Sequence, residues 1–174
     1  RLSIIDLSEK GSQPLEFKNL IITFNGEIYN HSSVREELKR ESYTFLGSSD
    51  TEVLLKAFHK WGVTAISKLR GMFSFAIYDC IKNKITIARD PAGEKPIYYL
   101  LDEEKFAFAS EIKSLPISKK ELDYNSISYY LSYGYFPCLE TPFSSVKKLQ
   151  PGAFAEINLN EAKINITSFW DLIS

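Results

Sequence analysis

The chain has 174 residues and a formal net charge of -1, from 21 basic and 22 acidic side chains. Such a balance gives no long-range attraction to nucleic acid or to anionic lipid, so neither is expected as a partner. The hydrophobic fraction of 44% supports a single folded domain with a sizeable core. No apolar run approaches the roughly 20 residues that a membrane-spanning helix needs. With no basic, apolar leader in view, we expect a cytoplasmic protein without membrane contact.

The predicted elements begin with strands at residues 2–7 and 20–24. Asn25-Gly26 after the second strand predicts a hairpin turn. Two capping boxes predict helices, one from Ser33 with Glu36 through Leu38, and one from Ser49 with Glu52. The second helix is amphipathic and should end at Gly62, before a short helix over residues 65–69.

After residue 71 the apolar period changes from 3.6 to 2, which is typical of strands. Strands are predicted at 72–79, 85–88, 97–101, 106–109, 153–157 and 164–167, with a helix at 126–133 that ends at Gly134. Short turns between strands indicate antiparallel pairing, so the fold class is α+β. The chain begins with Arg1 and stops soon after Trp170, and we interpret it as a fragment of a longer protein.

Nucleophile, metal and nucleotide motifs are sparse. Cys80 and Cys138 form no CxxC pair, and Cys80 is interpreted as a packed, inert thiol. His31 and His59 are far apart, so neither a metal site nor a Ser-His-Asp triad is expected. The chain has no glycine-rich phosphate loop, so no nucleotide site is expected in it.

Polar residues at the ends of the elements could form a site. They are Arg1, Asn25, Gly26, Glu27, Asp50, Arg89 and Asp90. Each also has a plain structural interpretation: a cut point, a turn, a helix cap or a surface ion pair. Together, an amide side chain with a glycine N–H makes an oxyanion hole, an arginine binds a carboxylate, and two carboxylates hold an ammonium. Such a set would suit the amide of a free amino acid such as glutamine, and the residues alone leave both interpretations open.

Several blocks of sequence decide between the structural interpretation and a glutamine site. They are Arg1-Leu2-Ser3-Ile4-Ile5-Asp6, Phe24-Asn25-Gly26-Glu27-Ile28-Tyr29-Asn30, Ser49-Asp50-Thr51-Glu52, Leu69-Arg70-Gly71-Met72-Phe73, Ala88-Arg89-Asp90, Gly93-Glu94-Lys95-Pro96, Phe108-Ala109-Ser110-Glu111, Leu149-Gln150-Pro151-Gly152 and Phe169-Trp170. In these blocks the chain resembles the glutaminase domain of glutamine-hydrolysing asparagine synthetases, which are class II amidotransferases. The resemblance covers essentially the whole chain in order.

The resemblance implies a four-layer αββα sandwich of antiparallel sheets, the N-terminal nucleophile (Ntn) hydrolase type, truncated at its N-terminus. Residues 1–158 would be the amidotransferase domain, and 159–174 the start of a linker to an absent synthetase domain. The family's nucleophile is an N-terminal cysteine that uses its own α-amine as base, with a pKa of about 7.7–8.0. The matching blocks put this cysteine before Arg1, so we expect the fragment alone to be inactive.

The resemblance also assigns roles to residues. Asn25 and Gly26 would hold the oxyanion, Arg1 the α-carboxylate of L-glutamine, and Asp50 with Glu27 its α-ammonium. Ile5 would contribute backbone contacts beside the pocket. The expected reaction releases glutamate and ammonia.

The ammonia would attack aspartate activated by ATP and Mg in the synthetase domain, so no cofactor is expected in this chain. The expected partners are glutamine and that domain, and relatives of this type often form homodimers. The aromatic cluster at Tyr129, Tyr130, Tyr133, Tyr135 and Phe136 is interpreted as helix packing, with the synthetase domain as one candidate surface. Two alternatives stay open: an amidotransferase with a sugar or peptide acceptor, and a non-catalytic glutamine-binding or assembly module.

Overall fold

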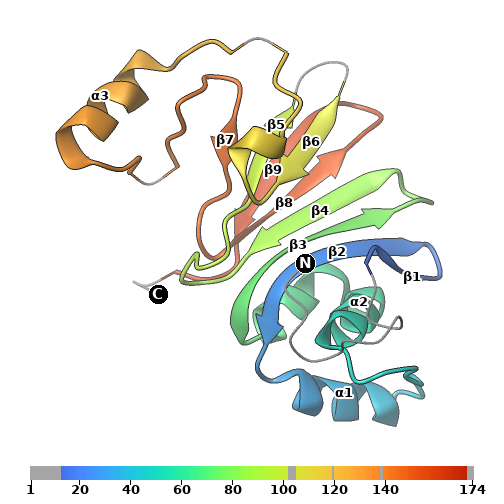
Figure 1. The fold of residues 1–174 in the computed structure, drawn as a ribbon. Coiled ribbons are helices and arrows are strands. Elements are labelled where there is room, and N and C mark those ends of the chain that lie inside the picture. Colours follow the sequence, from blue (N-terminus) through green and yellow to red (C-terminus); the bar gives the residue numbers. More distant parts are fainter. Residues whose placement is uncertain (1–12, 102–104, 119, 138, 172–174) are drawn as a thin grey trace.

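The computed structural model describes residues 13–101, 105–118, 120–137 and 139–171 (Figure 1). Arg1, Ile5, the strand predicted at residues 2–7 and Cys138 lie outside these ranges. The described strands form two sheets in which every pairing is antiparallel.

The larger sheet has six strands in the order β1-β2-β3-β4-β8-β9. Their bounds are β1 Leu15–Phe17, β2 Leu20–Ile28, β3 Gly71–Asp79, β4 Lys84–Arg89, β8 Ala153–Asn158 and β9 Lys163–Ser168. The smaller sheet has the order β6-β5-β7, with β5 Tyr98–Leu101, β6 Phe106–Ala109 and β7 Lys147–Lys148. The helices are α1 His31–Arg40, α2 Asp50–Trp61 and α3 Tyr124–Tyr133, with 3-10 turns η2 Gly62–Lys68 and η3 Ile112–Ser114.

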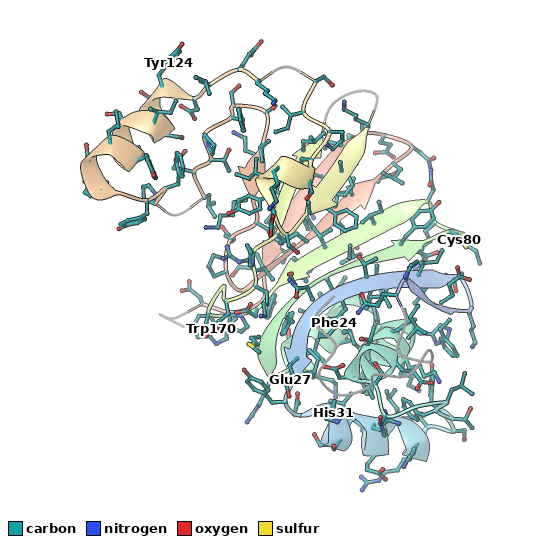
Figure 2. All side chains as sticks on the ribbon, viewed as in Figure 1. Phe24, Glu27, His31, Cys80, Tyr124 and Trp170 are labelled. Carbon is teal, nitrogen blue, oxygen red and sulfur yellow. The ribbon has the colours of Figure 1, made fainter. Side chains whose placement is uncertain are left out.

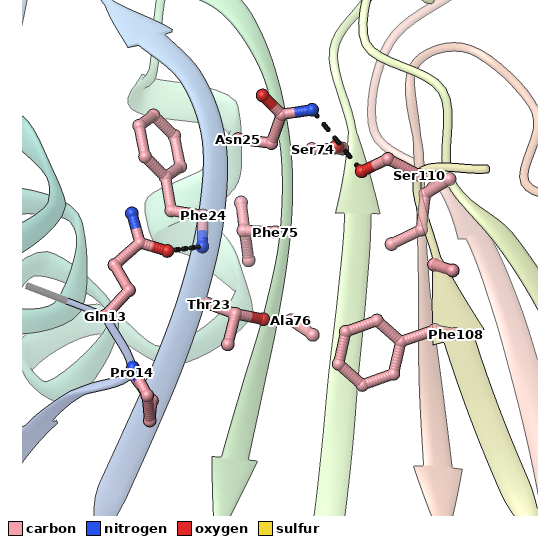
Figure 3. Close-up of a pocket in the computed structure, with 12 residues that line it drawn as sticks. Gln13, Pro14, Thr23, Phe24, Asn25, Ser74, Phe75, Ala76, Phe108 and Ser110 are labelled. Atoms are coloured by element: carbon pink, nitrogen blue, oxygen red, sulfur yellow. Dashed lines mark hydrogen bonds between the residues drawn. The ribbon is translucent and has the colours of Figure 1, made fainter. Parts of the chain in front are cut away.

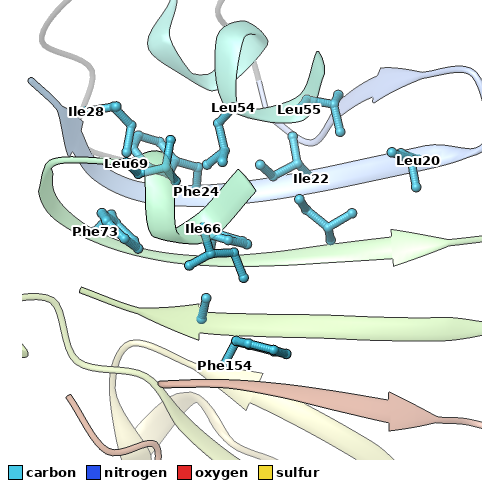
Figure 4. Close-up of a cluster of buried hydrophobic side chains, with 13 residues drawn as sticks. Leu20, Ile22, Phe24, Ile28, Leu54, Leu55, Ile66, Leu69, Phe73 and Phe154 are labelled. Atoms are coloured by element: carbon cyan, nitrogen blue, oxygen red, sulfur yellow. The ribbon is translucent and has the colours of Figure 1, made fainter. Parts of the chain in front are cut away.

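The elements stack in layers. Helix α2 and the 3-10 turn η2 cover one face of the large sheet, helix α1 packs against them, and the small sheet covers the other face (Figure 1). The helix-side core joins α2 and η2 to the sheet through side chains such as Leu54, Ile66, Phe73 and Phe75 (Figure 4). The inter-sheet core joins Ile87 and Ala155 to Tyr99 of the small sheet. The α+β sandwich with antiparallel sheets is therefore confirmed.

The central strands are buried on both faces, which explains their apolar sequence. In β3, Phe73, Phe75 and Ile77 face the helices, while Ser74 and Ala76 face the small sheet. A strand covered on both faces needs no polar alternation. The outer face of the small sheet is covered by η3 and neighbouring loops, around Leu100, Leu115 and Val146.

The hairpin turn predicted at Asn25-Gly26 is wrong. Strand β2 continues to Ile28 and pairs with β3, with Asn25 opposite Ser74 and Gly26 opposite Phe73. Gly26 has a φ of +141°, and a Cβ there would overlap the carbonyl oxygen of Met72. The glycine is needed for the close approach of two strands and not for a turn.

Helix boundaries are partly as predicted. Ser49 is the N-cap of α2 and accepts from the Thr51 N–H at 3.2 Å, whereas Glu52 does not complete the capping box. Ser33 lies inside α1, whose cap position is Asn30, so the capping box there is wrong. Gly62 and Gly134 end α2 and α3 at φ values of +59° and +78°.

Two other interpretations concern the surface and the C-terminal end. Cys80 is exposed in the turn after β3 and is not packed, because the strand ends one residue earlier. Strand β9 belongs to the large sheet and pairs with β8, and the division of domain and linker at residue 158 stays a prediction. None of the helices in the described ranges has the length and hydrophobicity to cross a bilayer.

Candidate functional site

The candidate site lies along the outer edge of β2. The Tyr29 N–H donates to Arg70 O at 2.7 Å and the Cys80 N–H to Asn19 O at 3.0 Å. Both bonds extend the β2–β3 register, so odd-numbered residues of β2 direct their N–H groups at β3. The N–H groups of Phe24, Gly26 and Ile28 therefore point to the opposite edge.

Side chains cap this edge on both sides of Gly26. The Phe24 N–H donates to Gln13 Oε1 at 2.7 Å, and the Ile28 N–H donates to Asp50 Oδ2 at 3.0 Å. The Gly26 N–H lies between these two capped donors. A backbone donor on such an edge is available to an oxygen of a ligand.

A pocket of about 340 Å³ opens beside this edge, on the face of β2 that is turned away from the helices. Its lining residues are Gln13, Pro14, Thr23, Phe24, Asn25, Ser74, Phe75, Ala76, Ile97, Phe108, Ala109 and Ser110 (Figure 3). The Asn25 amide lies in it and its Nδ2 donates to Ser110 Oγ at 3.3 Å. One N–H of this amide is thus held by Ser110, and the second is left for a ligand oxygen.

Asp50 connects the start of α2 to the end of β2. Its side chain is buried, Oδ2 accepts from the Ile28 N–H and Oδ1 from the Thr51 N–H at 2.9 Å. An ionised carboxylate has about four acceptor positions, so two remain for a ligand donor. Glu27 is half-buried and shares with Asn25 the face of β2 opposite the helix-side core.

Glu52 and Lys56 hold the loop that leads into Asp50. Glu52 accepts from the Leu46 N–H at 2.9 Å, the Gly47 N–H at 3.1 Å and Lys56 Nζ at 2.5 Å. Burial by itself would raise the pKa of Glu52, but these hydrogen bonds outweigh it and lower the pKa below its usual value. This buried ion pair therefore fixes the position of the first turn of α2.

Arg89 and Asp90 do not join the pocket, contrary to the combined interpretation of the sequence. The Arg89 guanidinium donates to the carbonyl oxygens of Leu149 at 2.8 Å and Lys95 at 3.1 Å, and burial lowers its pKa. Asp90 accepts from the backbone N–H groups of Phe73, Glu94 and Lys95. The hydrogen bonds of both side chains hold the loop after β4 in place.

Asn25, Gly26 and Glu27 are neighbours in β2, and Asp50 reaches the end of that strand through its hydrogen bond with the Ile28 N–H. Arg1 and Ile5 lie outside the described residues, so their placement is a prediction, as are all the assigned roles. Sequence reasoning missed Ser110 and Gln13 as lining residues. Ser110 could have been found, because it lies in one of the sequence blocks that carry the resemblance and directly follows a predicted strand. Gln13 lies in none of these blocks, so nothing in the sequence indicated its position in the pocket.

Known proteins match both the sequence and the fold. The model of the glutamine amidotransferase domain family matches residues 1–170. Asparagine synthetase [glutamine-hydrolyzing] 1 of Bacillus subtilis is 45% identical over 88% of this chain and 25% of its own length. The putative asparagine synthetase [glutamine-hydrolyzing] 2 of Methanocaldococcus jannaschii is 33% identical over 99% of this chain and 37% of its own. This chain therefore spans a quarter to about a third of these relatives.

Solved structures share the fold at low identity. The glutamine phosphoribosylpyrophosphate amidotransferase of B. subtilis gives a TM-score of 0.64 at 20% identity, over 94% of this chain and 33% of that one. A class-II domain protein of Silicibacter pomeroyi gives 0.58 at 19% identity, over 93% of this chain and 72% of that one. The chain belongs to the glutamine amidotransferase domain family, and it is homologous to the glutaminase part of asparagine synthetases.

Proposed function

We propose that this chain is the glutaminase part of a glutamine-hydrolysing asparagine synthetase. The observation that carries the proposal is the Asn25 amide in the pocket beside the edge of β2, together with the N–H of the next residue, Gly26, which points out from that same edge. Both are neutral donors, fixed before a ligand arrives, as an oxyanion hole requires. The similarity of the sequence to asparagine synthetases supports the same assignment.

In this proposal the side-chain amide of glutamine enters the pocket with its carbonyl oxygen toward Asn25 Nδ2 and the Gly26 N–H. A cysteine thiolate, expected before Arg1, attacks the carbonyl carbon, and the two donors stabilise the negative charge that develops on the oxygen. The C–N bond breaks, and ammonia leaves with a proton from the α-amine of the same cysteine, which acts as the base. Water then hydrolyses the thioester to glutamate and the free thiol.

Recognition of the amino acid itself needs charged groups around its α-carbon. Asp50 and Glu27 would bind the α-ammonium, and Arg1 would bind the α-carboxylate. Asp50 suits this task because its backbone hydrogen bonds fix the carboxylate while acceptor positions remain.

The acceptor half of the reaction belongs to the longer protein. There ATP and Mg would activate the β-carboxylate of aspartate, which ammonia converts to asparagine. The fused synthetase part, a cytoplasmic location and a homodimer are components of this proposal. The dimer is tested by the molar mass of the full-length protein in light scattering.

An isotope experiment on the full-length protein tests the function. Glutamine labelled with 15N at its amide is supplied with aspartate, ATP and Mg, and the products are analysed by mass spectrometry. The proposal predicts 15N-asparagine and glutamate. Glutamate with label in a different amide product would indicate another acceptor, and no glutamate at all would indicate a binding or assembly module.

A further inference from the structure

Asp90 is the most deeply buried acidic side chain among the described residues, and the proposed mechanism does not use it. It is 0% exposed and directly follows β4. Its Oδ2 accepts from the Phe73 N–H at 3.2 Å and the Lys95 N–H at 3.0 Å, and its Oδ1 accepts from the Glu94 N–H at 2.9 Å. Burying a carboxylate is costly unless its oxygens are hydrogen-bonded, and three backbone donors meet that need. The carboxylate thus ties β3, at Phe73, to the loop after β4.

At the end of β4, the side chain of Asp90 takes over a bond that its backbone would otherwise make. The Asp90 N–H donates to Phe73 O at 2.8 Å, in continuation of the β3–β4 register. The Asp90 carbonyl oxygen, however, accepts from the N–H groups of Gly93 at 3.0 Å and Gly152 at 2.9 Å. The Phe73 N–H is left to the carboxylate, and a buried donor without an acceptor would be costly. The position of Phe73 therefore depends on the Asp90 side chain.

Phe73 lies directly opposite Gly26 in the β2–β3 ladder. Because the odd-numbered residues of β2 bond to β3, Gly26 and Phe73 form a pair without mutual hydrogen bonds, the kind in which opposite Cα atoms come closest. A Cβ on Gly26 would lie 2.7 Å from the Phe73 Cα, so the two backbones are in direct contact here. A displacement of Phe73 is therefore passed on to Gly26, whose N–H points out from the other edge of β2.

We propose that Asp90 is a positioning residue for the oxyanion hole, because by holding Phe73 it sets where the Gly26 N–H lies. The proposal rests on the proposed function, in which this N–H binds the carbonyl oxygen of glutamine. A backbone donor is placed only by the strand that carries it. An error of about 1 Å in the placement of such a group can cost about 100-fold in rate.

Steady-state kinetics of glutamine hydrolysis by the full-length protein test the assignment. Asp90→Ala removes the acceptor of all three bonds, and we expect kcat to fall about ten- to 100-fold while KM stays within about twofold. The matched control is Asp79→Ala, because Asp79 is also buried and its Oδ1 also accepts three N–H groups. Asp79 lies at the opposite end of β3, beside Cys80 and far from Glu27 in Figure 2.

Both alanine variants should have a lower thermal midpoint, but only Asp90→Ala should lose kcat. An equal loss of kcat in the two variants, or none in Asp90→Ala, would overturn the proposal. Asp90→Asn keeps the size of the side chain, but its NH₂ group must face at least one of the three backbone N–H groups. We expect its kcat to lie between those of Asp90→Ala and the wild type, and a wild-type kcat would count against the positioning role.

NMR of the full-length protein gives a readout that needs no turnover. Labelling the asparagine carbonyls with 13C and the glycine nitrogens with 15N selects glycines that follow asparagine, and Asn25-Gly26 is the one such pair in this chain. The signal of Gly26 is the one that Asn25→Ala removes. Asp90→Asn should shift this signal, whereas Asp79→Asn should leave it in place. An unmoved signal in Asp90→Asn would overturn the positioning role even if the wild type released no glutamate, so the two failures are told apart.

Discussion

Asn25 on β2 and Ser110, which directly follows β6, are joined by a hydrogen bond of 3.3 Å between Asn25 Nδ2 and Ser110 Oγ, across 85 residues of sequence. This bond connects the large sheet to the small sheet at the rim of the pocket. It also orients the amide that we assign to the oxyanion hole. Ser110 is therefore a positioning residue in the proposed mechanism.

Loss of the Ser110 hydroxyl should slow glutamine hydrolysis without abolishing it. One neutral hydrogen bond contributes about 1 kcal/mol, so Ser110→Ala should lower kcat about fivefold with little change in KM. Ser110→Thr keeps the hydroxyl and should recover most of the rate. The measurement is glutamate release by the full-length protein. Equal rates for the wild type and the alanine variant would show that Asn25 is oriented without Ser110.

Removal of the Asn25 amide should have a much larger effect. Loss of one oxyanion donor typically costs about 2.7–4 kcal/mol of transition-state stabilisation, which is about 100- to 1,000-fold in kcat. Asn25→Ala should show this loss with a thermal midpoint close to that of the wild type. Asn165→Ala, on the exposed surface of β9, is the control and should retain full activity. A kcat within a few-fold of the wild type would remove Asn25 from the site.

Gly26 should tolerate no side chain. Gly26→Ala combines a φ of +141° with a Cβ that would overlap Met72 O, so the two strands must separate. We expect a loss of stability larger than the roughly 1 kcal/mol cost of a positive φ alone. Gly62→Ala is the matched control, because its φ is also positive, at +59°, and a Cβ there meets no neighbour within 4 Å. Urea unfolding compares the two, and equal losses would contradict this account of the strand contact.

Neutralising Asp50 should weaken glutamine binding. A hydrogen bond to a charged group contributes about 1.5–3 kcal/mol, so Asp50→Asn should raise KM about 10- to 100-fold. Asp123→Asn is the control, because Asp123 also accepts backbone N–H groups at a helix start but lies at α3. The KM of each variant is measured beside its thermal midpoint. An unchanged KM would leave Asp50 with a structural role only.

The buried Glu52–Lys56 pair should make the fold sensitive to acid. The pKa of Glu52 is lowered in the folded protein, so its contribution to stability is present above the unfolded pKa of about 4.3. This contribution is lost as the pH falls through the lower, folded value. Glu52→Gln should therefore flatten the decline of unfolding free energy between about pH 5 and pH 3. The control is Glu161→Gln in the exposed β8–β9 turn, and an identical decline in both variants would contradict the assignment.

Local chemistry in the sequence was enough for most of the regular elements, but not for the short strands β1 and β7 or for the end of β2. The 3.6 and 2.0 periods placed α2, β3 and the later hairpins, and Gly62 and Gly134 marked helix ends, because these signals act within a few residues. The blocks around Asn25 and Asp50 identified the family, since they occur together and in order.

Only the tertiary structure decided where those residues lie. The Asn-Gly pair looked like a turn, yet pairing with β3, a strand more than 40 residues later, keeps β2 extended and requires glycine for close contact. Arg89 and Asp90 looked like ligands of the site, yet buried backbone groups of distant segments take their hydrogen bonds. Ser110 reached Asn25 only because the two sheets stack. Contacts between distant segments depend on how the sheets pack, and local propensity does not determine that packing.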